Sequence, residues 1–182
     1  MTDFPHPEGA CGPVRRVAPD EVPALAAFGA ACFREAYGGH FAAADLARLC
    51  AAAFSLPVME RLVRDGTWVA GDWQGYVALG QVACPIPGLA EPTLELARLY
   101  VAGTWQGRGV ADRLMARFIQ EARARGGRSV WLQAFAGSPR ALAFYRRWGF
   151  EDHGPYVLAV EGLVLPHRML GMNLQGAGSD PS

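Results

Sequence analysis

The pattern of apolar and polar positions is clearest between Val110 and Ala122. Apolar residues recur every four positions there, and charged residues occupy the opposite side. A repeat near 3.6 residues predicts an amphipathic helix over 110–125. The pair Gly126-Gly127 ends this helix, because glycine readily adopts the left-handed conformation that often follows helices. The apolar stretch 129–135 is typical of a buried strand.

The same patterns predict the other elements. Helices are expected from Asp20, as the cap, to Gly38, and over 43–53, 57–64 and 139–148, the last with Ser138 as N-cap and Pro139 as first residue. Strands are expected over 13–18, 67–71, 75–84, 93–101, 150–160 and 163–174. Residues 1–12 and 175–182 are expected to be flexible tails around a single domain over 13–174. The order predicts a mixed α/β architecture, with a sheet covered by helices.

The charged residues are balanced and unusual in kind. The chain of 182 residues has 17 acidic and 17 basic residues, and every basic one is arginine. Zero net charge disfavours a nucleic-acid binder, which needs a surplus of cations for phosphates. A chain without lysine cannot form a lysine Schiff base or supply the lysine of a P-loop. The absence of a G-x-S-x-G motif disfavours a serine hydrolase.

The cysteines and the hydropathy narrow the setting. Cys11, Cys32, Cys50 and Cys84 are scattered without a C-x-x-C pair, so we expect four buried free thiols and no metal site. Free thiols favour a reducing, cytoplasmic location. No apolar run approaches the ~20 residues that cross a membrane. The first residues lack the pattern of a signal peptide.

The first candidate site is the junction Gln106-Gly107-Arg108-Gly109-Val110-Ala111, where the strand at 93–101 gives way to a helix. Two glycines allow a tight turn and the close approach of a ligand. The first amides of a helix have no partner within it and lie at the positive end of its dipole, which favours an anion such as a pyrophosphate. Arg108 can add a charge-assisted contact. An ordinary glycine turn is the alternative.

Two further candidates lie on either side of this loop. With a period of two, Glu95 shares a strand face with Leu99 and Val101, and a lone carboxylate on an apolar face is expected to have a raised pKa. Such a group suits a general base that acts directly or through water. Tyr145 lies on an apolar helix face, where its hydroxyl serves either packing or proton donation.

Together these residues resemble the GCN5-related N-acetyltransferase (GNAT) family. That family has a Gln/Arg-x-x-Gly-x-Gly/Ala loop before a helix, which Gln106–Ala111 matches. It also has a later Asn-x-x-Ala-x-x-Phe/Leu-Tyr-x-x-x-Gly-Phe segment, which Ser138–Phe150 matches with serine in place of asparagine. The resemblance covers 13–174. It implies a central, mostly antiparallel mixed sheet flanked by helices, with the strands at 93–101 and 129–135 parallel and splayed for coenzyme A.

The resemblance implies acetyl-CoA as the cosubstrate. The glycine loop would hold its pyrophosphate, and the strand from Leu99 to Val101 would pair with the pantetheine arm and polarise the thioester. Glu95 matches the position of a base, and Tyr145 matches the residue that protonates the leaving thiolate. The implied cofactor-binding residues are Leu99, Tyr100, Val101, Gln106, Gly107, Arg108, Gly109, Val110, Ala111, Ser138, Ala141 and Tyr145.

The front half of the chain, from Phe33 to Ser55, resembles the polyamine-acetyltransferase branch of the family. In that fold the first two helices and their loop line the acceptor site, which implies Tyr37, His40 and Phe41 as acceptor contacts; exposed loop residues are the alternative. The acceptor itself stays open among a polyamine, a small amine, an antibiotic, an amino acid and a protein N-terminus. Family members often form homodimers, and the sequence does not decide the oligomeric state.

The expected reaction is direct transfer to an amine in a ternary complex. Glu95 would remove the amine proton, backbone N–H groups would stabilise the oxyanion and Tyr145 would protonate the thiolate. A route through an acetylated cysteine is disfavoured, because no cysteine lies in either motif. The alternatives are a non-catalytic acyl-CoA-binding or regulatory module on the same fold, and a protein N-terminal acetyltransferase.

Overall fold

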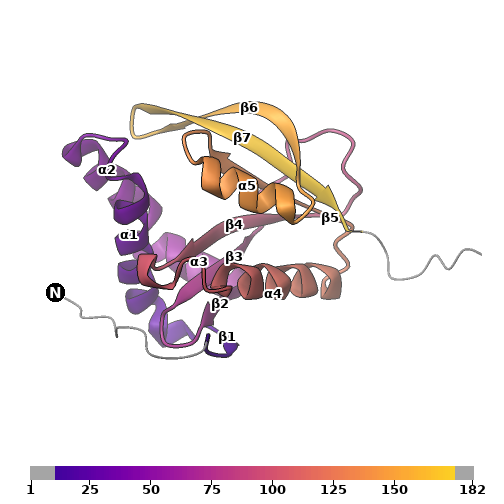
Figure 1. Cartoon of the computed structure of the whole chain (residues 1–182), viewed down its shortest axis with the longest axis horizontal. Helices are drawn as coiled ribbons and strands as arrows, with labels where there is room; N and C mark the ends of the chain where they lie inside the picture. Colours follow the sequence, from indigo (N-terminus) through magenta and orange to yellow (C-terminus); the bar gives the residue numbers. More distant parts are fainter. Residues whose placement is uncertain (1–10, 175–182) are drawn as a thin grey trace, which may run out of the picture. The chain divides into compact units, whose positions relative to one another are not determined.

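The computed structural model describes residues 11–174 (Figure 1). Its strands are β1 (Val14–Arg16), β2 (Thr67–Ala70), β3 (Gly75–Gly80), β4 (Thr93–Val101), β5 (Ser129–Phe135), β6 (Glu151–Val160) and β7 (Leu163–Asn173). Its helices are α1 (Val22–Tyr37), α2 (Ala43–Ala53), α3 (Leu56–Gly66), α4 (Val110–Ala124) and α5 (Pro139–Arg147), with short 3-10 turns η1 (Pro19–Glu21) and η2 (Gly103–Trp105). Apart from residues 11 and 12, the expected tails lie outside the described residues.

The strands form a seven-stranded mixed sheet in the order β1-β2-β3-β4-β5-β7-β6. The pairs β1–β2, β2–β3, β5–β7 and β6–β7 are antiparallel, whereas β4 and β5 are parallel. The parallel ladder is short and runs from Thr93–Ser129 to Glu95–Trp131. The mixed α/β fold with this parallel pair and flanking helices is confirmed.

The chain divides into two compact units. Unit 1 holds the residues up to Gly80 together with Arg98–Phe118, and unit 2 holds Gln81–Ala97 together with the residues from Ile119 onward. The glycine loop therefore belongs to unit 1, whereas Glu95 and Tyr145 belong to unit 2. The single domain over 13–174 stays a prediction.

Unit 1 packs α1 and α3 against the β2–β3 hairpin. Leu25 and Phe28 of α1, Met59 of α3 and Trp68 of β2 are almost completely buried. The apolar residues of α1 follow the helical spacing of the sequence, which brings one stripe of the helix to the core. This burial is the main source of stability for helices that are too short to persist alone in water.

The start of α1 differs from the expectation. Asp20 does not cap the helix, which begins at Val22 without a side-chain cap. Glu21 has the structural role at this end: its carboxylate accepts two hydrogen bonds at 2.7 Å from the guanidinium of Arg15 and one at 2.9 Å from the N–H of Ala18. These bonds, that of Arg15 first, lower the pKa of Glu21 to about 2.

The connection between β3 and β4 is longer than expected. β3 ends at Gly80 rather than at residue 84, so Cys84 lies in this connection. Pro85 and Pro87 follow, and proline lacks the N–H that a strand ladder needs. The other expected bounds lie within two residues of those observed, the usual uncertainty at the ends of elements.

Unit 2 is built on β5, β7 and β6. β7 pairs with β5 along its whole length, from Ser129–Asn173 to Phe135–His167. Trp131, Leu132 and Leu170 of these strands are almost completely buried. The connection from β3 folds onto them, because Ile86 packs in one buried cluster with Trp131 and Met169.

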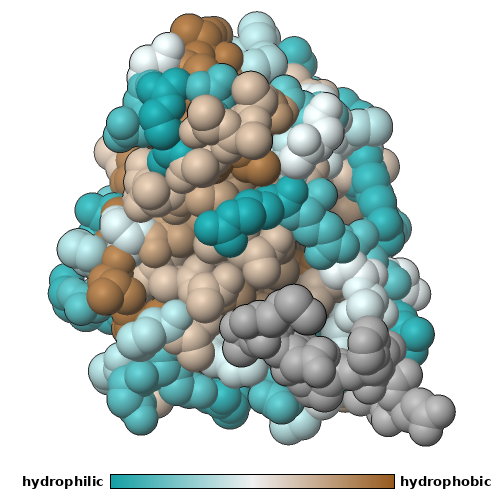
Figure 2. All heavy atoms as spheres, turned by 90° about the vertical axis from the view of Figure 1, so that its left-hand side faces the viewer, coloured by the Kyte–Doolittle hydropathy of each residue, from teal (hydrophilic) through white to brown (hydrophobic). Residues whose placement is uncertain are grey.

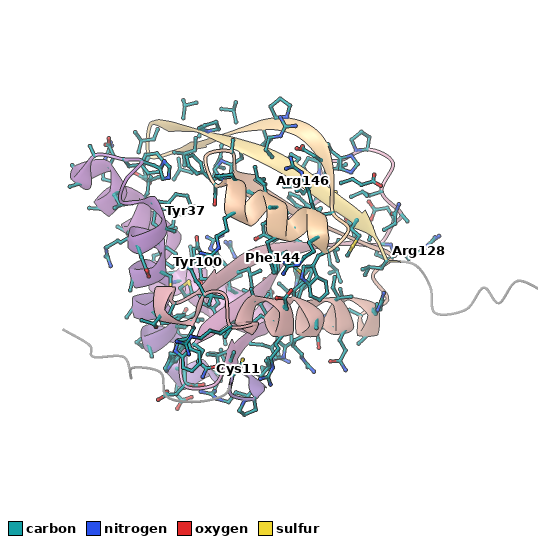
Figure 3. All side chains as sticks on the ribbon, viewed as in Figure 1. Cys11, Tyr37, Tyr100, Arg128, Phe144 and Arg146 are labelled. Atoms are coloured by element: carbon teal, nitrogen blue, oxygen red, sulfur yellow. The ribbon has the colours of Figure 1, made fainter. Side chains whose placement is uncertain are left out.

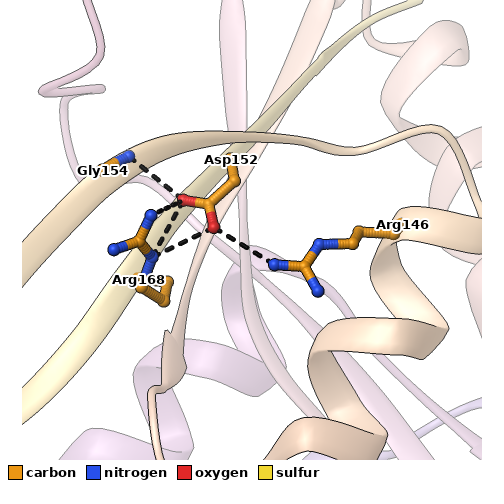
Figure 4. A network of polar contacts seen from close by, with 4 residues as sticks. All are labelled: Arg146, Asp152, Gly154 and Arg168. Atoms are coloured by element: carbon orange, nitrogen blue, oxygen red, sulfur yellow. Dashed lines mark hydrogen bonds and ion pairs between the residues drawn. The ribbon is translucent and has the colours of Figure 1, made fainter.

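A charged network joins α5 to the β6–β7 hairpin (Figure 4). Asp152 on β6 accepts hydrogen bonds from Nε of Arg168 on β7, at 3.0 Å to each carboxylate oxygen, and from the N–H of Gly154 at 3.1 Å. Arg146, next to Tyr145 on α5, adds a longer contact of 3.4 Å. These partners, Arg168 first, lower the pKa of Asp152.

The ends of α5 are only partly as expected. Ser138 is the N-cap residue and Pro139 follows it, but the hydroxyl of Ser138 makes no cap bond. At the other end Gly149 has a φ of 90°, and the N–H of Phe150 bonds to the carbonyl of Tyr145 at 3.1 Å. This is the glycine-dependent closure that satisfies the last carbonyls of a helix.

The cysteines correct one expectation. All four are free thiols, but only Cys32 and Cys50 are buried; Cys11 and Cys84 are half-buried. Burial raises the pKa of the Cys32 thiol to about 12.

Apolar residues also reach the surface of the described chain. Leu56, Val82, Val157 and Val164 are exposed, and Figure 2 shows apolar residues interspersed with hydrophilic ones on one face. None of the helices within 11–174 combines the length and the apolar character that crossing a membrane requires.

Candidate active site

The glycine loop of unit 1 leads directly into α4. Gly107 and Gly109 have φ values of 76° and 80°, which an L-residue adopts at a cost of about 1 kcal/mol or more. No atom lies within 4 Å of the place a Cβ would take at either glycine, so conformation rather than crowding requires glycine here. The residues from Gln106 to Gly109 are exposed. The loop therefore places accessible backbone at a helix N-terminus, which suits a pyrophosphate.

Both polar side chains of this loop contact neighbours in unit 1. The guanidinium of Arg108 lies 5.5 Å from the ring centre of Trp105 in η2, a cation–π contact. Nε2 of Gln106 donates a hydrogen bond of 3.4 Å to the carbonyl of Val101, at the end of β4. These contacts hold the side chains beside the loop.

The expected acceptor residues lie where α1 ends and the connection to α2 begins (Figure 3). Tyr37 is the last residue of α1, and its ring centre lies 4.4 Å from that of Phe33 and 6.2 Å from that of Phe41. The N–H of His40 bonds to the carbonyl of Tyr37 at 2.9 Å and turns the chain. The structure thus brings Tyr37 and Phe41 together and leaves the side chain of His40 exposed.

Phe54 and Arg98 extend this aromatic surface, and sequence reasoning missed both. The guanidinium of Arg98 lies 6.0 Å from the ring centre of Phe54. Tyr100 contacts the ring of Phe54 at 6.0 Å and stacks on Tyr76 at 5.7 Å. Burial raises the pKa of Tyr37, and the charge of Arg98 opposes that rise. Contacts between β4 and α2 leave no signal in the local pattern of either segment.

Glu35 is another residue that the sequence does not reveal. Its carboxylate accepts the N–H of Gly103 at 3.3 Å, across 68 residues of sequence. The same carboxylate occupies the place that a side chain at Gly103 would take. Glu35 therefore ties α1 to η2, the turn that precedes the glycine loop.

In unit 2, Glu95 lies on β4 beside Trp131 of β5. The two residues are partners in the parallel ladder, so their side chains leave the same face of the sheet. On that face Trp131 packs with Ile86 and Met169. Glu95 itself is half-buried. A carboxylate beside an apolar cluster has the surroundings expected of a general base.

Tyr145 lies on α5, held by packing and by the end of the helix. Its ring makes edge-to-face contacts with Phe144 and Phe150, at 5.5 and 5.8 Å between ring centres. The side chain is half-buried. Ala141 lies one turn earlier on the same side of the helix, and Ser138 lies at its start. Each unit thus carries one part of the expected set of residues.

Metal ligation was also considered. Within residues 11–174, no three His, Cys, Asp or Glu side chains come together in a way that could hold a metal ion.

The comparison with known proteins identifies the family. The model of the acetyltransferase (GNAT) family matches residues 29–150, so the chain belongs to the GNAT family. It is similar to the uncharacterized N-acetyltransferase YjgM of Escherichia coli, with 31% identity over 97 residues. That match covers 53% of this chain and 57% of the length of YjgM.

Two solved structures have the same fold. One is the PaiA N-acetyltransferase from Thermoplasma acidophilum in complex with coenzyme A: the TM-score is 0.70 at 14% identity, over 89% of this chain and 98% of that chain. The other is YncA from Salmonella typhimurium with its cofactor acetyl-CoA: the TM-score is 0.62 at 18% identity, over 96% of this chain and 100% of that chain. At these identities the likeness shows the fold.

Proposed function

We propose that this protein is an acetyl-CoA-dependent N-acetyltransferase that acetylates a primary amine in a ternary complex. The observation that carries the proposal is the exposed Gly107–Gly109 loop at the start of α4, in a chain of the GNAT family. Relatives of the same fold bind coenzyme A and acetyl-CoA, which supports the same ligand here.

The chain's own residues suit such a ligand. The amides from Gly107 to Ala111 bind the pyrophosphate, and Arg108 supplies the cationic contact in a chain without lysine. The backbone from Leu99 to Val101 pairs with the pantetheine arm. Ser138 and Ala141 of α5 contact the same arm.

The proton transfers follow from the chemistry of an amine. The acceptor arrives as an ammonium ion, which must lose a proton before its nitrogen can attack, and the Glu95 carboxylate accepts that proton. The C–N bond then forms and the C–S bond breaks. The departing thiolate takes the proton of Tyr145, and the second proton of the acetylated nitrogen returns to Tyr145. The proton on Glu95 leaves to solvent, so each turnover releases one proton.

The acceptor we favour is a small amine with an apolar body. Phe33, Tyr37 and Phe41 form a ring surface at the expected acceptor segment. A polyamine would need clustered carboxylates, whereas Glu35 bonds to the backbone of Gly103. The free thiols support a reducing compartment, the cytoplasm, as the location.

Two measurements on the full chain test this proposal. Calorimetry measures acetyl-CoA binding, and a thiol reagent follows release of coenzyme A with phenylethylamine, spermidine, an amino acid and a peptide with an unblocked N-terminus. We expect acetyl-CoA to bind and at least one amine to stimulate release, with phenylethylamine ahead of spermidine. Binding without amine-stimulated release indicates a non-catalytic acyl-CoA-binding module, and absence of binding overturns the proposal.

A further inference from the structure

Trp131 has a buried hydrogen-bond donor without a partner. Its side chain is 1% exposed, and within the described part of the chain no acceptor lies within hydrogen-bonding distance of its indole Nε1–H. Two positions earlier, Oγ of Ser129 is also buried and unpartnered. Leaving such groups unsatisfied is costly, and in proteins ordered water or a ligand usually satisfies them. One face of β5 therefore carries two polar groups that need a partner.

Glu95 lies on that same face. The parallel ladder pairs Thr93 with Ser129 and Glu95 with Trp131. Paired strands lie about 4.8 Å apart, and paired side chains point to the same side of the sheet. A water that accepts the indole N–H therefore lies within reach of the Glu95 carboxylate.

The surroundings of this pair are otherwise apolar. Ile86 and Met169 pack on Trp131, with Cys84, Leu89 and Tyr156 beside them. On β7 the partner of Trp131 is Gly171, and Leu89 and Nε2 of His153 lie over that glycine. The titratable groups facing Glu95 from these elements are thus Cys84, His153 and Tyr156. Of these, histidine is the type that titrates near neutral pH, so a test must separate His153 from Glu95.

We infer that Trp131 is a positioning residue whose indole N–H holds the water that carries the proton from the acceptor amine to Glu95. The inference rests on the proposed function. The water accepts the Trp131 N–H and donates to the Glu95 carboxylate, and its remaining lone pair faces the ammonium. An N–H bond of the ammonium breaks, its proton passes to the water, and one water proton passes to Glu95. Trp131 keeps its own proton and acts by orientation.

Trp131→Phe tests this inference, because it removes the N–H and keeps an aromatic ring. We expect kcat to fall about tenfold, the KM for acetyl-CoA to stay within about twofold, and the acidic limb of kcat/KM for the amine to move to higher pH. The limb moves up because the water, no longer polarised by the indole, stabilises the carboxylate less. Trp68→Phe is the matched control, since Trp68 is equally buried but lies in unit 1; it is expected to leave the pH profile unchanged.

Two further variants separate the explanations. If Trp131 acts through Glu95, adding Trp131→Phe to Glu95→Gln causes no further loss of kcat; multiplied losses indicate a merely structural role and overturn the inference. An acidic limb that persists in Glu95→Gln and vanishes in His153→Gln also overturns it. If Glu95→Gln alone has no effect, the proposed base is wrong and the inference fails with it. An effect of Glu95→Gln without one of Trp131→Phe defeats the inference alone.

A spectroscopic measurement covers the case in which Trp131→Phe does not fold. The chain has 5 tryptophans, whose indole N–H signals can be followed by NMR as pH changes. We expect one signal to titrate in the wild type with the pKa of the kinetic limb and to stop titrating in Glu95→Gln. If no indole signal depends on Glu95, the inference is overturned.

Discussion

Nε of Arg168 donates to both carboxylate oxygens of Asp152, at 3.0 Å each, across the β6–β7 hairpin. Charge-assisted bonds of this kind are stronger than bonds between neutral groups. The same carboxylate accepts the N–H of Gly154 and contacts Arg146 on α5. One side chain thus links both strands of the hairpin to the helix that carries Tyr145.

Asp152→Asn is therefore expected to destabilise the protein by about 1–2 kcal/mol. The amide keeps the shape of the side chain but loses the charge that pairs with Arg168. Asp45→Asn is the matched control: Asp45 pairs only with Arg48 three residues away on the surface of α2, and its loss costs under about 0.5 kcal/mol. Urea unfolding of both variants measures the difference, and equal effects would contradict the role given to Asp152.

The pair of Glu21 and Arg15 predicts a dependence of stability on pH. The pKa of Glu21 is about 2 in the folded protein, against 4.5 for an unperturbed carboxyl. Its contribution is therefore fully present above pH 4.5 and is lost as the pH falls toward 2. Because the pair is partly exposed, we expect Glu21→Gln to cost under about 1 kcal/mol at pH 7. Unfolding curves of variant and wild type should converge near pH 2, and a constant difference would refute this reading.

The glycine loop offers a test with an internal control. Gly107→Ala places an L-residue at a φ of 76°, and we expect the KM for acetyl-CoA to rise about tenfold as the loop distorts. Gly126→Ala imposes the same strain at a φ of 77°, also with no atom within 4 Å of the new Cβ, but beyond the other end of α4. It should lower stability without changing the KM, and a similar KM in the two variants would exclude the loop from binding.

Burial of the thiols predicts their reactivity. Cys32 and Cys50 are buried, and the pKa of each thiol is raised by burial. At pH 7.5 we expect a bulky thiol reagent to label only Cys11 and Cys84 in the native protein within minutes, and all four cysteines after denaturation. Peptide mapping by mass spectrometry identifies the labelled positions. Rapid labelling of Cys32 in the native state would contradict its placement in the core.

The fold was predictable because local patterns carry it. The four-residue repeat of α4 and the alternation in the strands set most of the elements, and the loop at Gln106–Ala111 with the segment Ser138–Phe150 pointed to the GNAT family. Asp20 failed as a cap because Glu21 bonds to both Arg15 and Ala18. Local preference favoured Asp20, and a tertiary contact decided otherwise.

The candidate site was predictable only where motifs mark it. The loop glycines, Glu95 and Tyr145 stand out in the sequence, whereas Trp131 looks like any apolar strand residue. Its relation to Glu95 comes from the register of a parallel ladder between strands 36 residues apart, as the pairing of residues 95 and 131 shows. Register of that kind depends on the whole sheet and leaves no mark on either strand alone.

The central claim, acetyl transfer to an amine, is tested most directly by following the acetyl group itself. Acetyl-CoA labelled with ¹³C in the acetyl group is mixed with the protein and the best amine of the panel, and NMR monitors the labelled carbon. We predict that the thioester signal converts to an amide signal at the rate of coenzyme A release, and that Glu95→Gln slows both equally. Conversion to acetate, or an unchanged thioester despite binding of acetyl-CoA, would contradict the account.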